Sequence, residues 1–217
     1  MIKSKVAIVF SVLLFVICMC LFFPFPNNTM YEARSTFMSF PLTNQDGYNL
    51  LGVVGSIVFV IAIILLYRGL KKYHFLTIVV AVIMYSLLPT FLITIYQETF
   101  ANGIHSISYD GRGNCNFKYE SNQLLDGECS LVLQNRSNRA VTFELEFLDS
   151  NYIEEDIQLE SLMNIDGPYK ITIQANQSKS FHVKEQIKVI DDEIHFQEGS
   201  SNLIHVKLIG KKSARIL

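Results

Sequence analysis

The sequence predicts a protein with three transmembrane α-helices followed by an all-β antiparallel sandwich. Two observations lead to this fold class. Before Gln97 the chain contains three long apolar runs that lack charged residues, and after Gln97 it alternates between polar and apolar residues. We therefore expect a membrane region over residues 1–97 and an extracytoplasmic β-sandwich domain over residues 98–217.

The three apolar runs contain no Asp, Glu, Lys, Arg or His. They cover residues 6–23, 50–67 and 75–96, which are 18, 18 and 22 residues long. A helix that crosses a bilayer needs about 17 to 25 such residues. We expect transmembrane helices near these positions and an outer loop over residues 24–49.

The first run has an alternative interpretation as a cleaved signal peptide, because Lys3 and Lys5 precede its apolar core. It ends in the aromatic and proline residues 22–26, without the pair of small residues that a cleavage site requires. We therefore expect the first helix to remain in the protein.

Basic residues near the spans predict the orientation, since they favour the cytoplasmic side. Lys3 and Lys5 precede the first run, and the connection over residues 68–74 carries three more positive charges. The loop over residues 24–49 contains only Arg34 as a basic residue. We expect a multi-pass protein of the cell membrane with a cytoplasmic amino terminus and its carboxy-terminal domain outside.

Within the second run, Gly52 and Ser56 form a pair of small residues four positions apart, which allows close helix packing. The runs lack ionisable residues, which proton relays and ion paths need at membrane depth. In the outer loop, Thr29 and Glu32 have capping-box spacing. This pattern favours a short helix at the membrane surface, and a flexible loop is the alternative.

The second half has the period of two that is typical of half-buried strands. Residues 141–147 are the clearest case, with Val141, Phe143, Leu145 and Phe147 on one face. Similar alternation occurs at residues 115–119, 129–133, 169–173, 181–183 and 204–208, and weaker patterns occur at 104–107 and 157–159. Short strands separated by Gly, Asn, Asp and Pro turns favour an immunoglobulin-like sandwich, and an OB-like barrel is the alternative.

Four cysteines divide between the two regions. Cys18 and Cys20 lie in the first apolar run, where they are expected to pack as small apolar side chains. Cys115 and Cys129 lie on inward-facing positions of consecutive strands in an oxidising compartment, which predicts a disulfide. Closing this loop contributes about 3 kcal/mol in the chain-entropy model. Two buried free thiols are the alternative.

A resemblance supports the fold prediction. Residues 129–147, Cys-Ser-Leu-Val-Leu-Gln-Asn-Arg-Ser-Asn-Arg-Ala-Val-Thr-Phe-Glu-Leu-Glu-Phe, are similar to a strand, turn and strand of bacterial extracytoplasmic immunoglobulin-like domains. The chain as a whole resembles uncharacterised small multi-pass membrane proteins of Gram-positive bacteria. The resemblance implies a fold and transfers no site residues, because unrelated functions share this fold.

Motifs for catalysis, cofactor binding and metal binding are missing from the sequence. His182 and His205 alternate with core positions, so we expect both on a solvated sheet face. The acidic runs at 154–156 and 191–193 lack a calcium-binding pattern. From Gln97 onward, 12 basic and 18 acidic residues give a formal charge of −6, which disfavours a nucleic-acid partner. The basic residues 211–215 are expected to be a solvated tail.

The sequence therefore predicts a non-catalytic protein that is anchored in the lipid bilayer. Its β domain would bind an envelope protein or a wall polymer through loops or a strand edge. The alternative is an accessory subunit whose helices pack against a larger membrane transporter, sensor or enzyme complex.

Overall fold

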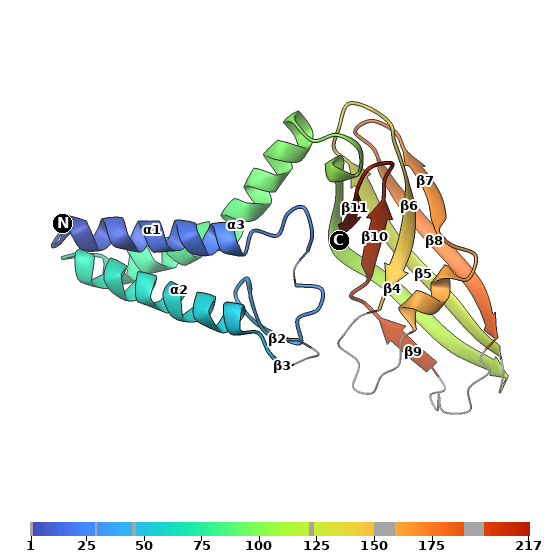
Figure 1. The fold of residues 1–217 in the computed structure, drawn as a ribbon, viewed down its shortest axis with the longest axis horizontal. Coiled ribbons are helices and arrows are strands. Elements are labelled where there is room, and N and C mark those ends of the chain that lie inside the picture. The colour runs from blue at the N-terminus through green and yellow to red at the C-terminus, as the bar shows by residue number, and fades with distance from the viewer. Residues whose placement is uncertain (1, 29, 45–46, 122–123, 150–158, 189–197) are drawn as a thin grey trace. The chain divides into compact units, whose positions relative to one another are not determined.

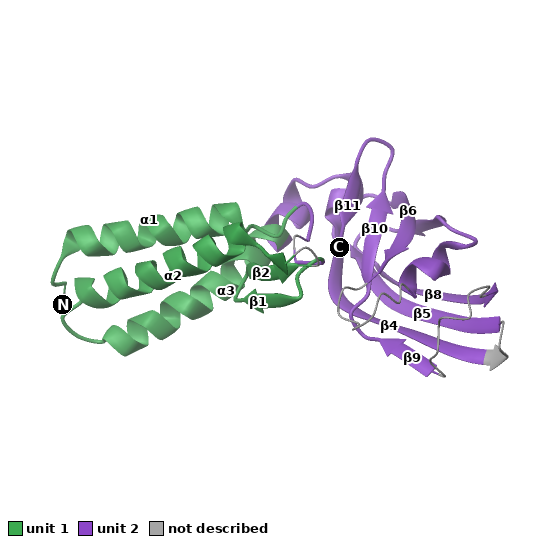
Figure 2. Ribbon diagram, turned by 60° about the horizontal axis from the view of Figure 1, so that its bottom comes forward, with its two compact units in different colours: residues 1–25, 32–93 green, residues 26–31, 94–217 purple. Residues whose placement is uncertain are grey.

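The computed structural model describes residues 2–28, 30–44, 47–121, 124–149, 159–188 and 198–217 (Figure 1). The chain divides into two compact units (Figure 2). Unit 1 comprises residues 1–25 and 32–93, and unit 2 comprises residues 26–31 and 94–217. The segment over residues 26–31 therefore belongs to the same unit as the carboxy-terminal half of the chain.

Three helices lie in the first half of the chain: α1 (Lys5–Leu21), α2 (Leu50–Gly69) and α3 (His74–Thr99). Polar side chains cap the first two. Ser4 accepts a hydrogen bond from the backbone N–H of Ala7, and Asn49 accepts one from Gly52. Helix α3 contains Pro89 and passes from unit 1 into unit 2 after Ile93.

The prediction of three transmembrane helices was wrong. Among the described residues, α2 and α3, with 20 and 26 residues, are the helices long and apolar enough to cross a membrane, whereas α1 has 17 residues. The apolar run continues to Phe23, but the helix stops at Leu21. Pro24 disfavours the helical conformation of the residue before it, so apolar composition overstated the helix length.

The loop between α1 and α2 forms a small antiparallel sheet where a surface helix was predicted. Its strands are β1 (Ser35–Phe37), β2 (Phe40–Asn44) and β3 (Gly47–Tyr48). A turn through Met38, whose φ is 55°, joins β1 to β2. Thr29 lies outside the described residues, and residues 30–32 form turns.

In unit 1, α1 packs against α2 along small residues that recur every seven positions. On α2 these are Gly55, Ala62 and Gly69, and all three are buried. A Cβ atom on Gly55 would lie 2.4 Å from the Phe22 ring, and one on Gly69 would lie 2.6 Å from Ile8. The missing side chains allow the two helices to approach closely, and the spacing of seven keeps the contact on one face.

Two side chains of α1 donate hydrogen bonds to backbone carbonyls of α2 along this α1–α2 contact, which we call the seam. The Ser11 hydroxyl donates to the carbonyl of Ala62 at 2.7 Å, and the Cys18 thiol donates to that of Gly55 at 3.8 Å. At the other end, the backbone N–H of Lys3 donates to the carbonyl of Gly69 at 2.8 Å. The amino terminus therefore lies beside the end of α2.

Unit 2 is built from two antiparallel four-stranded sheets (Figure 1). The first has the order β8-β5-β4-β9, with β8 (Ser178–Lys188), β5 (Leu124–Asn135), β4 (Ile107–Ser121) and β9 (Glu198–Ser201). The second has the order β11-β10-β6-β7, with β11 (Ala214–Ile216), β10 (His205–Ile209), β6 (Val141–Leu148) and β7 (Tyr169–Ile173). Two 3₁₀ helices, η1 (Gly103–Ser106) and η2 (Glu160–Asn164), complete the unit.

Both sheets contribute to one apolar core. Alternate side chains of β5 and β6 are buried, which matches the period of two in the sequence. Phe117, Leu133, Leu145 and Phe147 are among the largest fully buried side chains. Met163 of η2 is also fully buried in this core.

Candidate functional site

The turn between β5 and β6 is organised around the fully buried side chain of Asn135. Its Nδ2 group donates to three backbone carbonyls, those of Arg139, Ile173 and Gln174, at 2.7, 3.2 and 3.1 Å. Its Oδ1 atom accepts bonds from the backbone N–H and hydroxyl of Ser137 at 3.0 and 2.8 Å, and from Ser106 at 3.3 Å. One amide thereby fixes η1, the β5–β6 turn and the end of β7.

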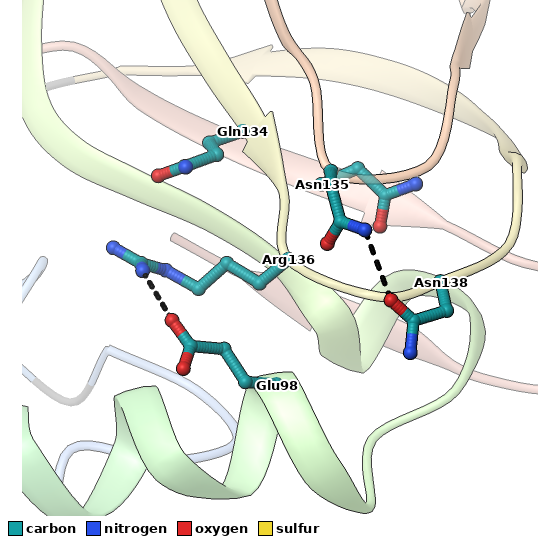
Figure 3. A pocket seen from close by; sticks show the side chains of 6 residues that line it. Glu98, Gln134, Asn135, Arg136 and Asn138 are labelled. Atoms are coloured by element: carbon teal, nitrogen blue, oxygen red, sulfur yellow. Dashed lines mark hydrogen bonds and ion pairs between the residues drawn. The ribbon is translucent and has the colours of Figure 1, made fainter.

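The next residue, Arg136, links this turn to the end of α3. Its guanidinium donates to Glu98 at 3.1 Å and to the Ser108 hydroxyl at 3.1 Å. Figure 3 shows the guanidinium pointing toward the Glu98 carboxylate. Glu98 is more exposed than Arg136, so this ion pair is partly solvated.

These residues border a polar pocket of about 220 Å³. Besides Glu98 and Arg136, its lining consists of the amide residues Gln134, Asn135, Asn138 and Asn176 (Figure 3). The Asn176 amide donates to Asn138 at 2.9 Å, and Asn176 adopts a positive φ of 54° that Asn tolerates. The pocket therefore presents amide donors and acceptors beside one ion pair, which suits an uncharged polar group such as a hydroxyl or an amide.

A second buried polar cluster lies where α3 enters unit 2. The Gln97 amide, which is 2% exposed, donates to the carbonyls of His105 and Ile107 at 3.1 and 3.0 Å. Arg215 of β11 is 4% exposed and donates to the same two carbonyls at 3.3 and 2.7 Å. Burial lowers the pKa of Arg215 to about 10, so it stays protonated at neutral pH. These bonds fix η1 on the last turn of α3.

The same arginine binds the segment over residues 26–31, which forms the outer neighbour of β11. Arg215 donates to the carbonyl of Pro26. The Asn28 N–H donates to the carbonyl of Ile216 at 3.0 Å, and the Ile216 N–H donates to the Asn27 side chain at 3.0 Å. This segment therefore covers the edge of the second sheet.

The two candidate disulfide residues lie opposite each other in the first sheet. Cys115 of β4 and Cys129 of β5 are directly paired, and a disulfide joins them. Both are fully buried. Cys18 is buried in the α1–α2 seam, and Cys20 is exposed.

The candidate packing pair, Gly52 and Ser56, makes contacts with β2 and within α2. A Cβ atom on Gly52 would lie 1.7 Å from the Pro41 carbonyl oxygen, so Gly52 packs against β2. The Ser56 hydroxyl donates to the Gly52 carbonyl at 2.8 Å within α2 itself. The helix seam instead uses Gly55, Ala62 and Gly69.

The histidines differ in their surroundings. His182 is exposed on β8 and lies 3.2 Å from Glu128. His205 is buried, contrary to the expectation of a solvated position, and its ring contacts the Tyr31 ring. The acidic runs at 154–156 and 191–193 lie outside the described residues. Within the described ranges, no three His, Cys, Asp or Glu side chains are grouped so that they could hold a metal ion.

Sequence reasoning missed Asn135, Gln97 and Arg215 as structural residues. From the sequence, the Asn residues between strands are predicted only as turn residues and Arg215 as part of a solvated tail. The apolar residues Ala214, Ile216 and Leu217 after a Gly-Lys-Lys-Ser turn were a signal for a last strand, but nothing in that pattern predicts a buried Arg215. Gln97 is the first strongly polar residue after a 22-residue apolar run, a position that suits an anchoring amide.

Comparisons with known proteins found no match, so a proposal about function must start from the geometry described above. No protein-family model, curated protein or solved structure matches the chain. The resemblance to extracytoplasmic immunoglobulin-like domains and to small Gram-positive membrane proteins therefore stays a prediction.

Proposed function

We propose that this protein is a membrane-anchored interaction module that holds its β domain outside the cell to bind an envelope protein or a wall polymer, without catalysis. The main support is the direct connection between α3 and the β domain. Gln97 and Glu98 of the last helical turn bond to η1 and Arg136. The last turn of α3 is thus part of the same unit as the β domain, so the chain that would anchor the protein continues directly into the domain that would bind.

The proposed orientation rests on charge and on the disulfide. Arg68, Lys71 and Lys72 lie between α2 and α3, the two helices that could cross a membrane. Positive residues favour the cytoplasm, which supports a cytoplasmic connection between these helices and an outer position for the domain after α3. The Cys115–Cys129 disulfide suits that oxidising side.

Cysteine labelling in intact cells tests this orientation. Lys212→Cys and Lys72→Cys are compared for reaction with a maleimide that does not cross membranes. We expect the cysteine at position 212 to react and the cysteine at position 72 to react only after the membrane is permeabilised. The opposite pattern would show that the β domain lies in the cytoplasm, which would rule out the proposed function.

The second candidate function, an accessory subunit of a larger membrane complex, has support from α3. Only 6% of its most apolar stretch is buried within the protein. Leu87 and Phe91 are 62% and 61% exposed. Lipid tails cover such side chains as well as another protein does. This observation is therefore weaker support than the hydrogen bonds between the last turn of α3 and the β domain.

Photocrosslinking with the full chain separates the two candidates. A photoreactive amino acid replaces Leu87 or Phe91 on α3 in one set of variants, and Val132 or Ser200 on the β domain in the other. The proposed function predicts that the second set captures the partner and that the first captures only lipid. Capture of one defined protein from α3 alone would make the accessory subunit the correct function.

A further inference from the structure

Strand β8 is the outermost strand of the first sheet. Its 11 residues, Ser178–Lys188, pair in continuous register with β5. Within the described part of the chain, no backbone group of β8 bonds on the other side. The strand therefore offers an open edge of N–H and C=O groups, which is the template that strand addition uses.

The pairing of the two cysteines shows which residues of β8 point their N–H and C=O groups toward this open edge. Cys115 and Cys129 are directly opposite, and their Cα atoms are 4.1 Å apart, as in a pair without mutual hydrogen bonds. Cys129 therefore bonds toward β8, where its partner is Val183. Because the register has no shift, the odd-numbered residues of β8 bond to β5. The even-numbered residues, including His182, Lys184 and Gln186, point their backbone groups away from β5.

The even-numbered side chains also lie on the solvated face, and two of them, Lys184 and Lys188, are lysines. Lys184 and Lys188 are exposed and take part in no ion pair among the described residues. Glu128 of β5 faces Lys184 and lies 3.2 Å from His182. Glu185 lies on the opposite face, where it accepts a hydrogen bond from Tyr169. Asp126 of β5 faces Gln186 on the solvated side, so the positive charges of β8 itself lie on its outermost row, beyond the carboxylates of β5.

The inward side of the same edge carries the apolar side chains of Phe181, Val183 and Ile187 beside Lys179 and Glu185. Phe181 is only half-buried, and its ring packs against Tyr169 with centroids 5.5 Å apart. A strand added beyond β8 would place alternate side chains over Phe181 and the others over the lysines. Its apolar side chains would thus extend the core while its charged side chains faced Lys184 and Lys188.

We propose, building on the function above, that the partner supplies an extended segment that adds to β8 as a further antiparallel strand, with acidic and apolar residues in alternation. Two acidic side chains four residues apart would face Lys184 and Lys188. The lysines give the edge selectivity, because pairing of β8 with a second copy would bring like charges together. An acidic strand replaces that repulsion with attraction.

Synthetic peptides and the full chain in nanodiscs test this proposal. The probe is a fluorescent peptide of alternating Glu and Val with the length of β8. One control replaces Glu with Lys, and another keeps the Glu and Val content in two blocks. We expect the alternating Glu peptide to bind about tenfold more tightly than either control, since two charge pairs and the strand pattern contribute.

Two variants distinguish strand addition from simple charge attraction. Lys184→Pro removes an N–H that points away from β5, so it should abolish peptide binding without breaking the sheet. Lys184→Ala is its matched control, which loses the charge but keeps the N–H, and should retain part of the affinity. The pair Lys184→Glu and Lys188→Glu should reverse the preference to the Lys peptide.

Hydrogen exchange measures the edge directly. In the free chain, the amides of His182, Lys184 and Gln186 should exchange much faster than those of Phe181 and Val183, and the peptide should slow only the first group. Equal protection in the free chain would show that the edge is already covered and would overturn the proposal. So would equal binding of the Glu and Lys peptides, or dimers that Lys184→Pro abolishes.

The photocrosslinking experiment separates this proposal from the function on which it rests. The Lys184→Pro chain should lose the partner that the β domain captures. If the variant still captures it, the interaction function stands and the partner binds elsewhere, so the β8 proposal falls. If the unmodified chain captures no partner through its β domain, the proposed function itself falls.

Discussion

The two units reach close packing by opposite means. In unit 1, α1 and α2 approach through the missing side chains of Gly55 and Gly69 and the small Ala62. In unit 2, large side chains such as Phe117 and Phe147 fill the space between two sheets. Removing apolar surface from water stabilises the second arrangement, whereas the first depends on close helix contact and on hydrogen bonds to helix carbonyls. The difference predicts which substitutions each unit tolerates.

Buried polar groups follow the same division. In unit 1, Ser11 and Cys18 each add one bond to a helix carbonyl. In unit 2, Asn135 and Arg215 each join several segments that are distant in the sequence. Loss of one polar side chain should therefore destabilise unit 2 much more than unit 1.

The largest effect is expected for Asn135→Ala, which leaves three backbone carbonyls without their buried donor. Each unsatisfied buried group costs about 1 to 3 kcal/mol, so we expect unit 2 to lose about 4 kcal/mol of unfolding free energy. Urea unfolding of the full chain in nanodiscs, followed by pulse proteolysis, measures this loss. Asn138→Ala, which removes one exposed bond in the same turn, should cost about 0.5 kcal/mol. Similar losses for both variants would disprove the role of Asn135.

The second effect concerns the disulfide. Replacing Cys115 and Cys129 together with Ala should lower the stability of unit 2 by about 3 kcal/mol, because the loop they close is then free in the unfolded chain. Unit 1 should be unaffected, which helical circular dichroism checks. The control Cys20→Ala changes an exposed free thiol. If reduction leaves the urea midpoint of unit 2 unchanged, the disulfide does not stabilise the fold.

The third effect tests the seam of unit 1. Gly55→Leu places a side chain where even a Cβ atom would lie 2.4 Å from the Phe22 ring, so that ring must leave its contact with α2. Overpacking of this kind costs about 1 to 3 kcal/mol. Thermal unfolding of the helices in nanodiscs measures it. Ile57→Leu on the exposed face of α2 is the matched control, and equal melting of both variants would show that the seam carries little of the packing.

The sequence predicted the parts of this molecule that depend on local pattern. The alternation at residues 141–147 lies in β6, because one buried face imposes the period of two. The disulfide partners could be named because only two cysteines lie in that half of the chain. The length of α1 and the sheet between α1 and α2 were missed, because Pro24 and the hairpin turn at Met38 act against composition.

Long-range contacts account for what the sequence did not show about the candidate site. Asn135 and Ile173 are 38 positions apart, and Arg215 and Ile107 are 108 apart. Nothing in the neighbourhood of either polar residue indicates which carbonyl it binds. The same holds for the pocket, whose residues come from α3, the β5–β6 turn and the β7–β8 turn.

The smallest expected effect is the dependence of the stability of unit 2 on pH. Burial lowers the pKa of His205 below its ordinary value of 6.5, although a hydrogen bond to the Leu217 backbone and the nearby Glu160 oppose this shift. Burial and Arg215 also lower the pKa of His105. The unfolded chain binds these protons more readily than the folded chain, so unit 2 should be most stable above about pH 6.5 and should lose stability as the pH falls below it.

The variant His205→Phe isolates one of these histidines. It keeps a ring against Tyr31 but cannot be protonated, so unit 2 should lose less stability between pH 7 and pH 5 than in the unmodified chain. Urea midpoints at several pH values provide the measurement. His182→Phe, on the exposed face of β8, is the matched control for the exchange of an imidazole for a phenyl ring outside the core. A parallel pH dependence in the His205→Phe and unmodified chains would mean that acid acts on unit 2 through groups other than His205.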